Sequence, residues 1–289
     1  MMAKKREDIK IGLGIIAFDD TCHLKSIVAE IRDLCDEIVV CLQKDSWHGD
    51  PIEDSVIEYV NELKSEKYID DIIWFESIND YPDDDPAKPR MIETDKRNFV
   101  LDFIQEKGCT HGHIIDSDEF YDHDDYKTAI DVILESKDVH VTYCQYINYY
   151  RDYSHVLVWP FLCYVPFISE IKYRFDFKNG SFDKPSDPTR RYHLDSGEKY
   201  CILAYRIVKM HHLSWIRKNI EEKIKNWSAK KYFKNIDELK ERIIERYNNY
   251  KDGQNAIILF NTPNNNVVVN RLTEQYINPK FSILEGIEK

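Results

Sequence analysis

Short apolar runs alternate with amphipathic stretches along the first 135 residues, and this alternation restricts the fold more than any other feature. The apolar runs are bounded by polar or turn-forming residues, as buried strands are. Between them, apolar residues recur at intervals of three and four, the period of an α-helix. Strands that alternate with helices in this way predict an α/β fold with a mixed, mainly parallel, Rossmann-like sheet flanked by helices. The expected strands are 9–17, 38–42, 72–75, 113–115, 139–150 and 201–208, and the expected helices are 24–35, 56–63, 92–107 and 126–135.

The C-terminal part of the chain has a more helical pattern. Helical spacing runs over residues 215–227, and Ser214 can cap the start of that helix. Asn235 and Glu238 form a capping-box pattern that predicts another helix. We therefore expect a main domain over residues 1–228 and a C-terminal helical extension with a tail over residues 229–289.

Composition excludes several classes of protein. The 289 residues include 40 Lys+Arg and 52 Asp+Glu, and the formal net charge of −12 argues against a protein that coats nucleic acid with its whole surface. No apolar run is long enough to cross a bilayer, and no signal-peptide pattern opens the sequence. The seven cysteines form no CxxC pair, which is typical of reduced thiols. We expect a cytoplasmic protein, and the abundance of Lys, Tyr, Ile and Asn resembles that of phages and low-GC bacteria.

An acidic cluster follows the predicted strand 113–115 directly. It has six carboxylates within Asp116–Asp125 (DSDEFYDHDD). Like charges at a strand end are unfavourable unless a cation neutralises them, and Mg²⁺ or Mn²⁺ prefers such oxygen ligands. The carboxyl end of a strand is also where open α/β sheets bind ligands. The alternative is a solvated acidic loop.

The helix before that strand carries Lys96, Arg97 and Asn98. Two cations facing a carboxylate-bound metal would form a site for a diphosphate. The alternative is that Lys96 and Arg97 lie on the solvent face and pair with Asp95 or Asp102.

Four blocks of the sequence resemble, in order, motifs of the family-2 nucleotide-sugar glycosyltransferases with the GT-A fold. The last block is similar to that of bacterial relatives that act on lipopolysaccharide core. The resemblance implies a GT-A-like catalytic domain over 1–228, an inverting transfer of hexosyltransferase type, a nucleoside-diphosphate sugar as donor (most simply a UDP-sugar) and Mn²⁺ or Mg²⁺ as cofactor. The blocks are Cys35–Leu42, Lys96–Ile104, Gly112–Phe120 and His212–Ser228.

The resemblance also implies roles for donor-binding residues. It puts Asp116 on the donor ribose, Asp118 on the metal of this DXD motif, and Arg97, in the block that includes Asn98, near the nucleotide or diphosphate. In that family the end of the first strand contacts the nucleobase of the donor, and Phe18 lies at the corresponding position. The family's nucleobase-binding Asp after the second strand is displaced here, so either Asp45 or Gln43 takes that role, or the base differs from uracil.

The block that starts at His212 lies in a basic segment. Residues 209–234 contain eight Lys or Arg and two Glu. The resemblance makes His212 a further metal ligand and lets Lys223 bind a phosphate or the acceptor. The segment suits a phosphorylated acceptor, such as a surface glycan or a modified base in phage DNA, although a basic solvent face would also account for it.

Inverting transfer needs a carboxylate that deprotonates the acceptor hydroxyl. Asp183, Asp187, Asp195 and Glu198 are the candidates, and we prefer Asp195. A different class of function stays open, in which the cluster Asp116–Asp125 serves a two-metal phosphohydrolase or nuclease. A non-catalytic sugar- or nucleotide-binding protein is a third possibility.

Overall fold

The computed structural model describes residues 9–18, 21–46, 50–77, 81–82, 85, 87–136, 139–158, 162–217, 220–226, 236–257 and 266–271. The chain forms two compact units. Unit 1 is Met1–Tyr146 with Cys163–Met210, and unit 2 is Ile147–Leu162 with His211–Lys289. The chain passes from one unit to the other within strands β6 (Val141–Tyr150) and β11 (Lys209–Trp215). The domain boundary expected after residue 228 lies outside the described residues.

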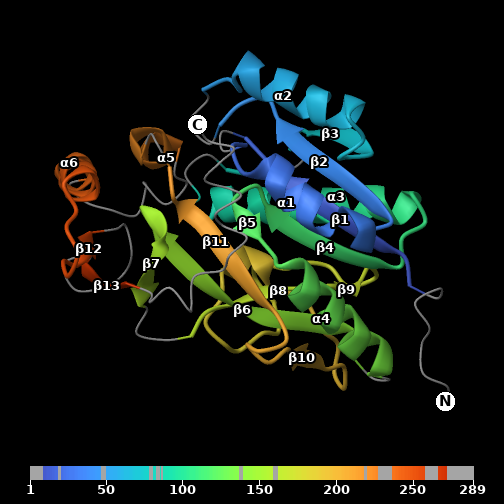
Figure 1. Ribbon diagram of the computed structural model, residues 1–289. Coiled ribbons are helices and arrows are strands. Elements are labelled where there is room, and N and C mark those ends of the chain that lie inside the picture. The colour runs from blue at the N-terminus through green and yellow to red at the C-terminus, as the bar shows by residue number, and fades with distance from the viewer. Residues whose placement is uncertain are drawn as a thin grey trace. The chain divides into compact units, whose positions relative to one another are not determined.

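Unit 1 is built on a five-stranded sheet with the order β3-β2-β1-β4-β9. The first four strands are parallel, and β9 pairs antiparallel with β4 (Figure 1). The mixed, mainly parallel, Rossmann-like sheet expected from the sequence is therefore confirmed. The strands are β1 (Ile11–Ile16), β2 (Glu37–Gln43), β3 (Asp71–Phe75), β4 (His111–Asp116) and β9 (Ser169–Glu170).

The expected helices of unit 1 are also present. α3 packs against β1, β2 and β4, and α1 packs against α4. α3 approaches β1 closely because β1 has glycine at position 14: a Cβ there would lie 2.2 Å from Val100 Cγ1. Gly108 (φ +84°) follows the end of α3, in the conformation that glycine adopts most readily. The helices are α1 (Leu24–Ile31), the 3₁₀ helix η2 (Arg32–Leu34), α2 (Asp54–Ser65), α3 (Lys88–Glu106) and α4 (His123–Glu135).

The rest of unit 1 consists of short elements. The first part of β6 pairs antiparallel with β8 (Tyr164–Pro166) and parallel with β10 (Tyr200–Ile202). β5 (Glu119–Phe120) follows β4, and the 3₁₀ helix η3 spans Pro188–Arg190. The strand expected at 201–208 is wrong beyond residue 202, because the backbone there turns and the N–H groups of residues 207 and 208 both donate to the carbonyl of residue 204.

Unit 2 has its own hydrophobic core, in which Tyr150 and Trp215 pack with Ile243. The helix expected at 215–227 is wrong in its first part. Ser214 and Trp215 belong to β11, where both side chains are buried, and Ser214 accepts a hydrogen bond from Lys223 instead of capping a helix. The elements are β7 (Asp152–Val158), α5 (Ile220–Asn226), α6 (Ile236–Asn248), β12 (Ala256–Ile257) and β13 (Asn266–Arg271).

The C-terminal helices α5 and α6 are thus confirmed, and two strands accompany them: β13 pairs antiparallel with β7 and with β12. Residue 235, expected to cap α6, lies outside the described residues. Within the described part of the chain, no helix has the length and apolar character needed to cross a membrane. All seven cysteines are free thiols, and five of them are buried.

Candidate functional site

The carboxyl ends of β1, β2 and β4 meet at one edge of the parallel sheet. Asp116 is the last residue of β4 and lies opposite Ile16, the last residue of β1. Phe18 follows two residues later, and Asp45 follows two residues after Gln43, where β2 ends. The structure therefore brings three of the predicted donor-binding positions to the edge where open α/β sheets bind ligands.

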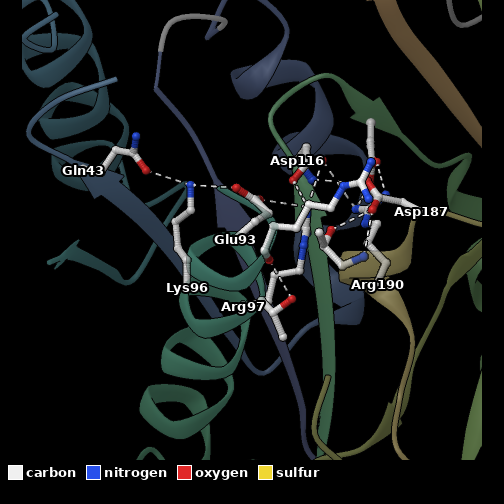
Figure 2. A network of polar contacts seen from close by, with 11 residues as sticks. Gln43, Glu93, Lys96, Arg97, Asp116, Asp187 and Arg190 are labelled. Carbon is white, nitrogen blue, oxygen red and sulfur yellow. Dashed lines mark hydrogen bonds and ion pairs between the residues drawn. The ribbon is translucent and has the colours of Figure 1, made fainter. Parts of the chain in front are cut away.

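Buried polar contacts connect the end of β2 to the end of β4 through α3 (Figure 2). Lys96 Nζ donates to Gln43 Oε1 at 2.8 Å and lies 3.3 Å from a carboxylate oxygen of Glu93. Arg97 Nη2 donates to Glu93 at 3.1 Å and to Asp116 Oδ1 at 3.0 Å. The side chains of Lys96 and Arg97 are only 5% and 2% exposed, so the alternative that they lie on the solvent face is wrong.

Asn98 faces a different part of unit 1. Its Nδ2 donates to the carbonyl oxygen of Phe175, and the N–H of Phe175 donates to its Oδ1, both at 2.9 Å. Both atoms of the amide are therefore used to anchor α3 to the backbone at Phe175. The donor-binding role expected for Asn98 stays a prediction.

Arg190, the last residue of η3, is a second buried arginine at this site, and no motif in the sequence predicts it. Its guanidinium pairs with both oxygens of Glu119, at 2.5 and 2.8 Å, and lies 3.7 Å from Asp116 Oδ2. The side chains of Arg190 and Glu119 are 5% and 2% exposed. The segment around Arg190 (DPTRR) has neither strand nor helix periodicity, so nothing local in the sequence signals that this arginine is buried.

The charges at the strand end decide the protonation of Asp116. Burial alone would raise the pKa of Asp116, but the positive charges of Arg97 and Arg190 outweigh it and hold the pKa below its usual range. The negative charge of Asp118 acts in the opposite direction and raises the pKa of Asp116. Asp118 itself is 8% exposed.

The later carboxylates of the acidic cluster have partners within the protein. Asp122 caps α4 and accepts hydrogen bonds from the backbone N–H groups of Asp124 and Asp125, at 3.0 and 3.3 Å. Asp125 also pairs with Lys209 at 2.6 Å. Lys209 and this helix cap therefore relieve part of the like-charge repulsion within the acidic cluster.

The donor set fits a divalent cation that is shared with a diphosphate. Among the described residues, no group of three or more His, Cys, Asp or Glu side chains is placed to hold a metal ion. Mg²⁺ often needs no such group, because one or two carboxylates and substrate phosphates complete its coordination. Asp118 can supply such a carboxylate, with Asp116 two residues before it at the end of β4. Beside them, Nε and Nη1 of Arg97 are buried without hydrogen-bond partners, a rare state for a buried donor and one that an anion would satisfy.

His212 and Lys223 belong to unit 2, whereas the carboxylates of β4 belong to unit 1. His212 Nδ1 contacts the side-chain oxygen of Asn148. Lys223 Nζ contacts Ser214 Oγ and lies 5.4 Å from the ring centroid of Trp215. The roles of His212 as a metal ligand and of Lys223 in binding phosphate or acceptor stay predictions.

Asp195, the preferred candidate for the catalytic base, lies on a surface turn. Its side chain is 85% exposed and lies 3.7 Å from His193 Nε2. Another of the four candidates, Asp187, caps η3 by accepting a hydrogen bond from the N–H of Thr189 at 2.8 Å, and Figure 2 shows it next to Arg190. Asp195 stays a prediction, and Asp187 is a second candidate because it caps the helix that carries Arg190.

Comparisons with known proteins give weak similarities only. No protein-family model and no curated protein matches the chain. One similar solved structure is glucosyl-3-phosphoglycerate synthase from Mycobacterium tuberculosis in complex with Mn²⁺, UDP and glucosyl-3-phosphoglycerate, at 11% identity over 49% of this chain and 45% of that chain, with a TM-score of 0.32. Another is S. aureus TarS 1-349, at 11% identity over 75% of this chain and 63% of that chain, with a TM-score of 0.37.

The chain thus matches less than half the length of the synthase. Similarities at this level do not assign a fold or a function, so both must rest on the residues of this chain.

Proposed function

We propose that the protein is a metal-dependent glycosyltransferase of GT-A type, which moves a sugar from a nucleoside-diphosphate sugar to a hydroxyl acceptor. The observation that supports it best is the pair Asp116 and Asp118 at the carboxyl end of a parallel strand, beside a buried arginine with unpaired donors. Such a transfer needs stabilisation of the departing diphosphate, and carboxylates that share a cation with it, together with a buried arginine, suit that task.

The residues of the strand end would divide the work of donor binding. Asp118 would hold Mn²⁺ or Mg²⁺, and the bound cation supplies positive charge to the departing diphosphate. Arg97 would donate from its buried Nε and Nη1 to the diphosphate or nucleotide. Asp116, kept ionised and oriented by Arg97, would accept hydrogen bonds from the ribose hydroxyls. Phe18 and Asp45 would contact the nucleobase, for which uracil is our first choice by resemblance.

The acceptor, the catalytic base and the inverting course of the transfer are inferred from the sequence. We propose an inverting hexosyl transfer with Asp195 as the base, and a cytoplasmic enzyme with a phosphorylated surface glycan as acceptor, ahead of a modified base in phage DNA. Lys223 and His212 would act from the basic segment. The two-metal alternative is less well supported, because Asp122 and Asp125 serve a helix cap and an ion pair.

A thermal-shift panel of UDP-, GDP-, CMP- and dTDP-sugars with and without Mn²⁺ tests the proposal. A ligand at 100 times its Kd stabilises the folded protein by about 2.7 kcal/mol, so one nucleotide sugar should raise the Tm clearly, and only with metal. Asp118→Asn should abolish this rise. Asp124→Asn is the matched control, because Asp124 belongs to the same cluster but its side chain is 86% exposed.

A different set of results would contradict the transferase proposal. If no nucleotide sugar changes the Tm while the protein hydrolyses a phosphodiester with Mn²⁺, the transferase proposal is wrong and the phosphohydrolase alternative is supported. Mixing the protein with DNA that contains modified bases, at low and at high salt, then tests the nucleic-acid acceptor separately.

A further inference from the structure

Arg190 joins parts of unit 1 that are far apart in the sequence. It lies 71 residues after Glu119, yet its guanidinium forms a bidentate pair with that carboxylate. The same guanidinium is 3.7 Å from Asp116 Oδ2. One side chain from η3 therefore contacts the residue that ends β4 and the residue that begins β5.

The turn between β4 and β5 carries Asp118, and charged partners hold it at both ends. At its start, Asp116 pairs with Arg97 at 3.0 Å. At its end, Glu119 accepts both hydrogen bonds from Arg190, and its Oε2 also accepts from the backbone N–H of Asp116 at 3.3 Å. Both oxygens of Glu119 are thus occupied, and this acid braces the turn that carries Asp118.

The element that supplies Arg190 is itself fixed. Asp187 caps η3 by accepting hydrogen bonds from the N–H and the hydroxyl of Thr189, at 2.8 and 2.9 Å. Pro188 restricts the backbone at the first position of η3, and Thr189 is buried. A guanidinium on a short, capped and partly buried helix has little freedom, as required of a group that orients another.

We propose that Arg190 is a positioning residue, which fixes the β4–β5 turn so that Asp116 is presented to the donor ribose and Asp118 to the cation. The inference rests on the proposed function for the identity of the ligand. Both terminal nitrogens of Arg190 already donate to Glu119, so we place this residue outside direct contact with the sugar and the diphosphate. Arg190 acts through Glu119, which shapes the turn, and through Asp116, whose charge it offsets.

Four variants separate positioning from simple stability. Arg190→Met leaves Glu119 buried without its partner, and we expect a lower Tm and at least tenfold weaker binding of Mn²⁺–UDP. Arg190→Lys keeps the charge but not the bidentate geometry, so it should recover part of the binding. Glu119→Met/Arg190→Met replaces the whole buried pair by apolar side chains and should recover the Tm without recovering the binding, because Asp116 still lacks its second arginine.

Arg191→Gln is the matched control. Arg191 is the next residue, but its guanidinium donates to the hydroxyl and the carbonyl of Ser186, and it takes no part in the strand-end network. Its Tm and its Mn²⁺–UDP binding should stay close to those of the unsubstituted protein.

Two measurements decide between the outcomes. The electron paramagnetic resonance signal of free Mn²⁺, titrated with protein in the presence of UDP, reports ligand binding. Amide hydrogen exchange of the segment 111–120 in the ligand-free protein reports the turn itself, and Arg190→Met should accelerate it at least tenfold while Arg191→Gln leaves it unchanged.

The inference is overturned if Glu119→Met/Arg190→Met binds Mn²⁺–UDP as tightly as the unsubstituted protein does. If the unsubstituted protein binds no nucleotide with Mn²⁺, the proposed function fails instead. Hydrogen exchange then tests the role of Arg190 without a ligand. Faster exchange of 111–120 in Arg190→Met supports the proposal that Arg190 positions the turn, and unchanged exchange overturns that proposal.

Discussion

His113 lies within β4, and its ring is buried among Tyr121, Tyr126 and Phe167. Its Nδ1 is 3.0 Å from the hydroxyl of Tyr126. Burial, with a further contribution from the charge of Arg190, lowers the pKa of His113 from 6.5 to about 3. The unfolded chain takes up this proton near pH 6.5 and the folded protein does not. The contribution of neutral His113 to the free energy of unfolding is therefore fully present above about pH 6.5, and it is lost as the pH falls from about 6.5 to 3.

We expect His113→Phe to remove this part of the pH dependence. Between pH 6 and pH 4, one such group makes the free energy of unfolding fall by about 1.4 kcal/mol per pH unit. Urea unfolding at pH 7, 6, 5 and 4 measures the slope. Tyr126→Phe is the control, because it removes the same hydrogen bond but leaves His113 in place, so its slope should match that of the unsubstituted protein. Equal slopes for the unsubstituted protein and His113→Phe would contradict the assignment.

The choice between Asp195 and Asp187 as catalytic base also belongs to single residues. Replacing the base by Asn should lower kcat by about 10²- to 10⁴-fold and leave nucleotide-sugar binding unchanged, because proton transfer acts only in the transition state. Steady-state kinetics of Asp195→Asn and Asp187→Asn, with binding measured separately, decides the question. Glu198→Gln is the control, since Glu198 lies on the same turn as Asp195 and tests whether a change of charge on that turn affects kcat by itself. Full activity of Asp195→Asn would exclude it as the base.

Among the elements, the packing of α3 on β1 depends on the absence of a side chain at Gly14. A Cβ there would lie 2.2 Å from Val100 Cγ1 and 2.7 Å from Ile114 Cδ1. Overpacking of this kind typically lowers the free energy of unfolding by about 1–3 kcal/mol. The same helix carries Lys96 and Arg97, so its distance from the sheet also sets their contacts with Gln43 and Asp116.

We therefore expect Gly14→Ala to destabilise the protein by about 1–3 kcal/mol. Val100→Ala removes the nearest methyl group, so the double substitution should cost less than the sum of the two single ones, by about 0.5–3 kcal/mol of coupling. Urea unfolding of the four proteins measures this cycle. If the changes in the free energy of unfolding caused by Gly14→Ala and Val100→Ala are additive, the two positions are not in tight contact.

For the whole molecule, the division into two units predicts how the protein unfolds. Ile104 belongs to the core of unit 1 and Ile243 to the core of unit 2, and both are fully buried. Truncation of either to Ala should weaken its own core by about 2–5 kcal/mol. Amide hydrogen exchange should therefore quicken most in unit 1 for Ile104→Ala and most in unit 2 for Ile243→Ala. The same pattern of exchange in both variants would show that the two units unfold as one.

Much of unit 1 could be predicted from the sequence because the signals are local. The alternation of apolar runs and helical spacing identified the parallel strands and helices α1 to α4, and the carboxylates at the end of β4 followed from their position after a buried strand. The local pattern gave a wrong prediction at Ser214 and Trp215, where the helical spacing extends into strand β11, whose last residue, Trp215, packs in the core of unit 2.

Only the tertiary structure decided which charges are buried together. Lys96 is held by Gln43, which is 53 residues away, and Glu119 by Arg190, which is 71 residues away. A lysine or arginine on a helix or loop is normally solvated, and burial becomes favourable only where a partner arrives from elsewhere in the chain. The acidic run by itself predicted that positive charge is needed at the end of β4. The fold determined that Arg97 and Arg190 supply such charge, because only folding brings α3 and η3 to that strand.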